Sequence, residues 1–159
     1  MKRFIIGCFL LCVIWIFSAP RVYAQNGVFI GFGAEANGNT FEGAAAVGGG
    51  WSFGVDLNRY IALGIKTTFS YDFDSTMATV EQAGLFRFYL PLKIRGPFLQ
   101  AEAGGGIVFE DKENYFCFAG GIAAGWRIGI GKNLYVEPAG RFGYPFIWGA
   151  GISIGAFIQ

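Results

Sequence analysis

The chain has 159 residues, of which 53% are hydrophobic, 18% aromatic and only 14% charged, and its formal net charge is +1. It contains no histidine, which excludes histidine-based catalytic triads and the usual zinc sites. The near-neutral charge offers no basic excess to attract nucleic acid, so we expect no nucleic-acid partner.

Residues 1–24 predict a cleaved secretory signal peptide. Lys2 and Arg3 precede an apolar run over 4–17, and small residues ending at Ala24 form a cleavage site. A run of 14 residues is too short to cross a hydrocarbon core of roughly 30 Å. Cys8 resembles a lipid-attachment cysteine, but too few apolar residues precede it.

Cleavage before Gln25 would leave one domain over residues 25–159. Lys2, Arg3 and Arg21 would leave with the signal peptide, so nine basic and eleven acidic residues would remain, a formal charge of −2. Cys117 would be the last cysteine, which excludes an internal disulfide.

The mature region predicts eight β-strands, because apolar and small or polar residues alternate between turn-forming residues. The expected strands span 28–36, 40–56, 60–71, 79–91, 97–109, 115–130, 134–142 and 146–158. They meet the roughly 9–11 residues that a tilted membrane strand needs. Pro138 falls on the outward face of the seventh strand and cannot donate a ladder hydrogen bond, so we expect a bulge there.

The alternation separates an apolar face from a charged one. In the third strand Leu63 and Ile65 share one face, whereas Lys66 lies on the other. The fourth strand tests the pattern, because Glu81 and Arg87 both fall on its polar face. Apolar residues outside and charges inside are typical of a strand that meets lipid.

All charges of the mature region can be placed away from lipid, where each would cost up to ~2–4 kcal/mol at mid-depth. A lumen charge network is expected from Glu35, Glu42, Lys66, Glu81, Arg87, Glu102, Arg127, Glu137 and Arg141. Turns at one end hold Asp56, Arg59, Lys93, Arg95 and Lys132. Loops at the other end hold Asp72, Asp74, Glu110, Asp111, Lys112 and Glu113.

Aromatic residues fall into two groups that predict girdles at the two membrane surfaces. The group near the turns contains Trp51, Phe53, Tyr60, Phe88, Phe98, Trp126 and Tyr135. The group near the loops contains Phe41, Phe69, Tyr71, Phe109, Tyr115, Phe142, Tyr144 and Trp148.

These patterns predict an all-β fold, an eight-stranded antiparallel up-and-down transmembrane barrel that is closed because lipid cannot satisfy open strand edges. We expect it in the cell outer membrane, in contact with outer-membrane lipid, with both mature termini in the periplasm. No pattern indicates a catalytic, metal or cofactor site, because the inward carboxylates have inward cations available as ion-pair partners.

The mature chain resembles small outer-membrane barrels of the OmpX, OmpW and OmpA-domain type, through its strand number, short turns, girdles and charged lumen. The segment 133–151 also looks like the closing hairpin of spirochaete barrel proteins. The resemblance implies insertion by the outer-membrane assembly machinery. The chain departs from it by ending on Gln159 rather than on an aromatic residue, and by having short loops.

Three functions remain open at this point. The first is a structural or surface-exposed barrel with an occluded lumen, which paired inward charges would fill. The second is a narrow OmpW-like channel for small solutes, which needs a gap beside the inward glycines and alanines. The third is an adhesin that binds host surfaces through its acidic loops. The oligomeric state is not indicated.

Overall fold

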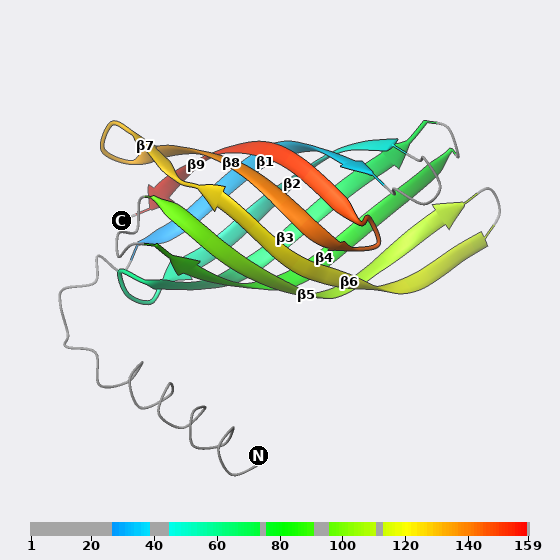
Figure 1. Cartoon of the computed structure of the whole chain (residues 1–159), viewed down its shortest axis with the longest axis horizontal. Helices are drawn as coiled ribbons and strands as arrows, with labels where there is room; N and C mark the ends of the chain where they lie inside the picture. The colour runs from blue at the N-terminus through cyan, green and yellow to red at the C-terminus, as the bar shows by residue number, and fades with distance from the viewer. Residues whose placement is uncertain (1–26, 39–44, 74–75, 91–95, 111–112, 159) are drawn as a thin grey trace, which may run out of the picture.

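The computed structural model describes residues 27–38, 45–73, 76–90, 96–110 and 113–158 (Figure 1). The expected signal peptide over 1–24 and the expected lumen residue Glu42 lie outside these residues. The strands are β1 (Val28–Gly38), β2 (Ala45–Asp56), β3 (Ile61–Asp72), β4 (Met77–Tyr89), β5 (Pro97–Glu110), β6 (Glu113–Trp126), β7 (Ile128–Ile130), β8 (Leu134–Tyr144) and β9 (Trp148–Ile158).

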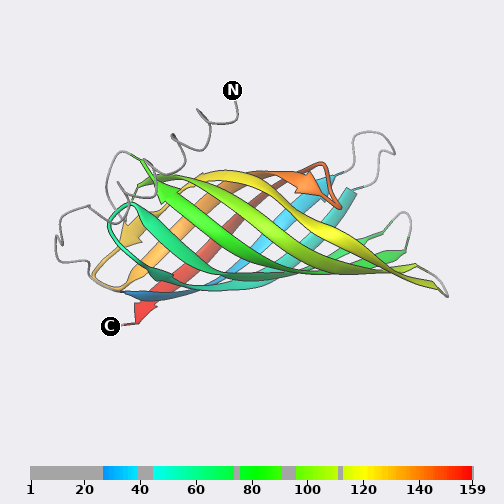
Figure 2. The ribbon, with the colours of Figure 1, turned by 90° about the horizontal axis from the view of Figure 1, so that it is seen from below.

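The strands form one closed antiparallel barrel, which confirms the predicted fold class (Figures 1 and 2). Each of β1 to β5 pairs with the next strand along the chain, as do β7 and β8, and β1 also pairs with β9, with Val28 opposite Ile158 and Gly38 opposite Trp148. The pairing of β6 with β8 completes the circle. Closure leaves no open sheet edge, as a lipid environment requires.

Strands β6 and β7 are one strand of the barrel, interrupted at Arg127, so the barrel is eight-stranded. Gly125 lies opposite Ala139, and Ile128 lies opposite Val136. An advance of three residues from β6 to β7 therefore matches an advance of three residues along β8, and no extra residue is inserted in either strand. The expected bulge at Pro138 is wrong, because the register passes through the proline unchanged.

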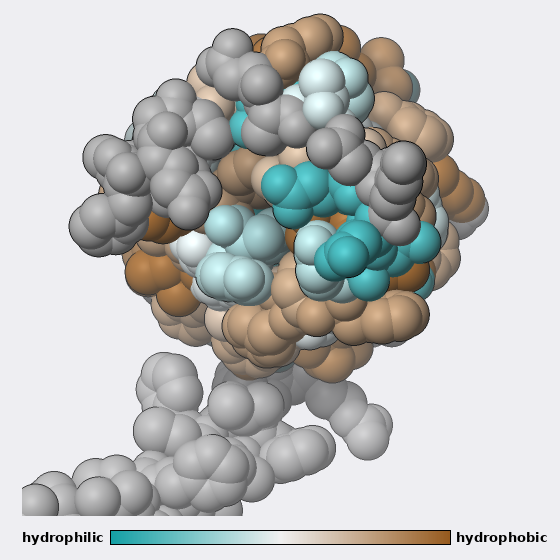
Figure 3. Space-filling view, turned by 90° about the vertical axis from the view of Figure 1, so that its right-hand side faces the viewer, coloured by the Kyte–Doolittle hydropathy of each residue, from teal (hydrophilic) through white to brown (hydrophobic). Residues whose placement is uncertain are grey.

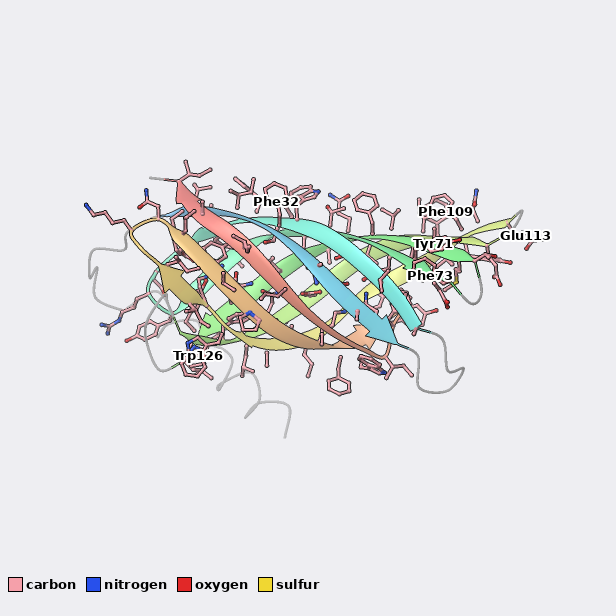
Figure 4. All side chains as sticks on the ribbon, turned by 90° about the horizontal axis from the view of Figure 1, so that it is seen from above. Phe32, Tyr71, Phe73, Phe109, Glu113 and Trp126 are labelled. Atoms are coloured by element: carbon pink, nitrogen blue, oxygen red, sulfur yellow. The ribbon has the colours of Figure 1, made fainter. Side chains whose placement is uncertain are left out.

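The two faces of the barrel follow the predicted alternation. Phe32, Phe118 and Ile154 are among the large apolar side chains exposed on the outside, and Phe32 and Trp126 point away from the ribbon in Figure 4. Every described charged residue within a strand lies on the inner face or at a strand end. Among the described residues, no helix is long and apolar enough to cross a membrane.

The two ends of the barrel differ. We call the end that carries residues 57–60 and 131–133 the turn end; Gly27 and Ile158 also lie there. The opposite end, with Phe73, Thr76 and residues 145–147, is the loop end. The hairpins β3–β4 and β5–β6 extend beyond the other strands at the loop end (Figure 2), and they carry Tyr71, Phe73, Phe109 and Glu113 (Figure 4).

A hydrophobic core lies inside the barrel at the turn end. It consists of buried Phe29, Ala62, Leu85, Tyr89, Phe98 and Tyr135. Phe98 and Tyr135 were expected in the outer aromatic girdle, and that placement is wrong, because their side chains are 3% and 0% exposed and belong to this core. The lumen is therefore filled with aromatic rings at one end.

Candidate functional site: a charged and aromatic lumen

The lumen contains eight of the nine charged residues expected there, all but Glu42, which is not described. They come from five strands and from the junction of β6 and β7. Every described lumen cation has a carboxylate within 4.0 Å. Two clusters result, one at the turn end and one near the middle of the barrel.

The turn-end cluster is built on Glu137 of β8. This carboxylate accepts hydrogen bonds from Arg87 Nη1 and, at 3.0 Å, from Arg127 Nη2. Arg127 Nη1 also lies 4.0 Å from Asp56 Oδ1, which in turn accepts a hydrogen bond of 3.4 Å from the Tyr89 hydroxyl. Two cations thus face two carboxylates inside the barrel wall.

Aromatic rings surround the two guanidinium groups. Arg127 Cζ lies 4.5 Å from the centre of the Phe29 ring and 4.2 Å from that of Tyr135. Arg87 Cζ lies 4.0 Å from the centre of the Phe98 ring. A cation over an aromatic face is attracted by the ring quadrupole, and more strongly when both are out of water. The aromatic core therefore stabilises the same cations that the carboxylates pair.

Small residues make this crowding possible. A Cβ atom at Gly155 would come within 2.2 Å of Tyr135 Cζ, and one at Gly54 within 2.4 Å of Phe29 Cζ. The rings occupy space that only glycine leaves open, as expected for a narrow barrel with a full interior.

The central cluster joins Glu35, Lys66, Glu81, Glu102 and Arg141. Arg141 Nη2 donates to Glu81 Oε2 at 2.8 Å, and its Nη1 donates to Glu35 Oε1 at 3.4 Å. Lys66 Nζ lies 3.3 Å from Glu35 Oε2 and 3.6 Å from Glu102 Oε1. Each of these cations is shared by two carboxylates.

Gln100 connects the two clusters. Its Oε1 accepts a hydrogen bond of 2.7 Å from Arg87 Nε, and its Nε2 donates to Glu102 Oε1 at 2.5 Å. Polar contacts therefore run continuously from the turn end to the middle of the lumen. Gln100 shares the predicted inner face of Glu102, but it was not included in the expected lumen network, which contained charged residues alone.

Three further lumen residues were assigned to turns or loops by the sequence. Asp56, Asn37 and Asp72 are each about 1% exposed or less, and each lies within a strand. The placement of Asp56 and Asp72 in turn and loop is therefore wrong. Asn37 Nδ2 donates to Glu35 Oε1 at 2.8 Å and to Ser70 Oγ at 3.0 Å. Strand parity would have found Asn37 and Asp72 had their strands been extended by one position, and it applies directly to Asp56, which ends the expected strand 40–56.

A cavity of about 100 Å³ remains beside the charged side chains. Small residues of β1 and β9 line it, including Gly33 and Gly151, and Lys66 and Arg141 face it. Its size suits a few water molecules.

The site holds charges in pairs and does not concentrate ligating groups. The described residues contain no group of three or more histidine, cysteine or acidic residues suited to a metal ion. At the loop end, polar residues gather at the centre of the barrel mouth and apolar residues surround them (Figure 3). The arrangement is that of a filled polar interior in an apolar wall.

Neither a protein-family model nor the sequence of a curated protein matches the chain. Three solved structures share its fold. Neisserial surface protein A is 12% identical, with a TM-score of 0.64 over 84% of this chain and 96% of that one. The N-terminal β-barrel domain of Pseudomonas aeruginosa OprF is 19% identical, with a TM-score of 0.57 over 85% and 99%. The de novo designed TMB2.3 is 17% identical, with a TM-score of 0.50 over 85% and 98%.

Proposed function

We propose that this protein is an integral outer-membrane barrel whose lumen is occluded, and that it acts as a structural or surface-exposed component of the membrane. The observation that carries the proposal is Arg127. Its side chain is 0% exposed, it pairs with Glu137, and the rings of Phe29 and Tyr135 lie over it. A solute would have to displace this side chain to pass the turn end.

The interior of an eight-stranded barrel is just wide enough for side chains to fill. Here Arg87 of β4 and Arg127, two strands further around the wall, meet on the same carboxylate, Glu137. Displacing either guanidinium would leave a buried charge unpaired, which is costly. Both the ion pairs and the packing therefore contribute to the energetic barrier against passage of a solute.

The same proposal includes the location of the protein. An export signal over 1–24 would deliver the chain across the inner membrane, and the apolar outer face would then contact outer-membrane lipid. The outer-membrane assembly machinery is the proposed insertion partner. With both chain ends at the turn end, we place that end in the periplasm and the loop end at the cell surface.

Conductance tests the occlusion. The mature chain from Gln25 is refolded into a planar bilayer, and a heat-modifiable shift in gel mobility verifies that the barrel has folded. We expect a folded protein that gives no current steps, because Arg87, Arg127 and the rings of Phe29, Phe98 and Tyr135 fill the turn end. We call this group the arginine–aromatic plug. Discrete, ion-dependent steps from the folded protein would overturn the proposal.

A narrow channel for small solutes is the second candidate, and the cavity beside Lys66 and Arg141 favours it. In a conducting barrel, ions would pass Lys66, so Lys66→Gln would shift the selectivity towards cations. Steps that appear in the wild type and change selectivity in this variant would support the channel. Current steps whose ion selectivity the substitution leaves unchanged would indicate leakage around the protein.

A further inference from the structure

Two polar side chains lie on the lipid-facing wall of the barrel near mid-height. Thr67 of β3 and Gln82 of β4 are opposite each other in the strand register, and each is within about one residue of the middle of its strand. On the Thr67 side the outer face carries the large Trp51 and Phe69, whereas on the β4–β5 side of Gln82 several outer-face residues are small. We call this group the small-residue patch; its members are Thr67, Gln82, Gly84, Ala101, Ala103 and Gly105.

Both polar groups of the small-residue patch lack a hydrogen-bond partner. Thr67 is 9% exposed, and its Oγ1 is buried without a partner. The Gln82 side chain is exposed, and no side chain in the described part of the barrel hydrogen-bonds its amide. An amide in hydrocarbon meets no water, so an unpaired one is unfavourable there. The observation points to a partner outside the barrel.

The glycines beside Gln82 also indicate a partner outside the barrel. Gly105 lies directly opposite Gln82 in the register, and Gly84 is the next residue of β4 on the outer face. A Cβ at either glycine would meet no atom closer than 3.7 Å. On the inner face, by contrast, a Cβ at Gly104 would come within 2.0 Å of the Gln82 carbonyl oxygen. Packing within the barrel therefore explains Gly104 but not Gly84 or Gly105.

We propose that the small-residue patch is the contact between two copies of this chain in the membrane, related by a twofold axis that passes close to Gln82. Glycine and alanine let two walls approach closely, and polar side chains within the hydrocarbon region then hydrogen-bond across the contact. In a twofold contact the same patch meets itself.

The chemistry of Gln82 selects a second copy as the partner. A carboxamide has two N–H donors and an acceptor oxygen, so two Gln82 side chains satisfy each other reciprocally. A dimer therefore satisfies the Gln82 amide, which the barrel leaves unpaired, without any feature that the chain lacks.

The apolar rim of the patch supports the same geometry. Phe86 lies two residues beyond Gly84 on the outer face and is 45% exposed, and Phe118 of β6, opposite Gly105, is 61% exposed. In the register, Phe86 is opposite Ala101 of β5, and Phe118 is on β6, beyond β5. Around a twofold axis, the rings of one copy lie over the small residues of the other.

The contact is tested by disulfide cross-linking in lipid vesicles. The mature chain with Cys117→Ala and Gly84→Cys carries one cysteine, in the patch, where the side chain fits. The matched control carries Cys117→Ala and Ile154→Cys, at a 61% exposed site near the middle of β9, four strands around the barrel from β4. On mild oxidation we expect a covalent dimer from the Gly84→Cys protein and little from the control.

A second variant isolates the hydrogen bonds. Gln82→Leu, added to the Gly84→Cys protein, keeps the barrel and its apolar exterior but removes the amide. With two reciprocal bonds of the strength measured inside membranes, dimerisation should weaken about five- to ten-fold. The fraction of covalent dimer formed on mild oxidation, at equal protein-to-lipid ratio, measures this loss, and heat-modifiability verifies folding.

Three results would overturn the proposal. One is equal cross-linking from Gly84→Cys and Ile154→Cys, which would show random collision. Another is an unchanged dimer fraction in Gln82→Leu. The last is a monomer in vesicles that cross-links only to a protein of different mass in native membranes, which would assign the patch to another partner. The test does not depend on whether the lumen conducts.

Discussion

At the scale of single residues, Arg127 matters most for the interior. Arg127→Ala removes the cation that faces Asp56 and Glu137. Breaking a buried pair on one side leaves an uncompensated charge, so we expect the free energy of unfolding to fall by about 3–5 kcal/mol. Urea titration of the protein in vesicles, followed by tryptophan fluorescence, measures the change.

Arg59→Ala is the matched control, because it makes the same substitution at the same end of the barrel. Arg59 is exposed and lies over the Tyr60 ring, 4.7 Å from its centre, so its loss should cost less than about 1 kcal/mol. Arg127→Met keeps apolar bulk without charge, and it should destabilise as Arg127→Ala does. Equal unfolding midpoints for the wild type and Arg127→Ala would contradict the role of the ion pairs.

The sequence could predict which face each charge occupies, but only partly which aromatic rings lie inside. Tyr135 shares the face of Glu137, so parity alone places it in the lumen, and the expected girdle position overlooked this. Which cation meets which carboxylate could not be predicted. Arg141 and Glu81 are 60 positions apart, and only the circumference and stagger of the closed barrel bring them together.

At the scale of strands, Pro138 explains the interruption between β6 and β7. The Arg127 N–H donates to the Gly96 carbonyl on the β5 side, at 2.8 Å. Its neighbour Trp126 therefore directs its backbone groups to β8, where residue 138 lies opposite. A proline there has no N–H to donate to the Trp126 carbonyl. One ladder hydrogen bond is missing although the register continues.

Pro138→Val should restore that bond. Valine provides the N–H, suits a strand and keeps an apolar side chain towards lipid. We expect the variant to be more stable by about 0.5–1.5 kcal/mol, the usual net value of one hydrogen bond. Urea unfolding gives the stability, and protection of the new amide from hydrogen exchange shows the bond itself. An unprotected amide at 138 would contradict this explanation.

Strand existence and order followed from alternation and turn residues, whereas strand ends did not. The observed ends differ from the expected ones by up to two residues where both are described, as at Asn37 and Tyr144. The reason is physical: asparagine and glycine are compatible with a turn, but cross-strand pairing with β9 continues through them to Gly38. Pairing between distant strands decides where a strand stops.

At the scale of the whole molecule, the two ends of the barrel are unequal. Val28 lies opposite Ile158 at the turn end, while the β3–β4 and β5–β6 hairpins project at the loop end (Figure 2). A chain that arrives from the periplasm keeps its termini on that side and carries hairpins across. Connections between strands are short at both ends, so the assignment depends on where Val28 and Ile158 lie and on the projecting hairpins.

This asymmetry predicts the orientation in cells. With Cys117→Ala as background, Glu113→Cys marks the loop end and Lys132→Cys marks the turn end, and both positions are exposed. A membrane-impermeant maleimide added to intact cells should label the first variant and spare the second until the outer membrane is permeabilised. If only Lys132→Cys were labelled in intact cells, the barrel would have the opposite orientation in the membrane. That outcome would put the arginine–aromatic plug at the cell surface and the protruding hairpins in the periplasm.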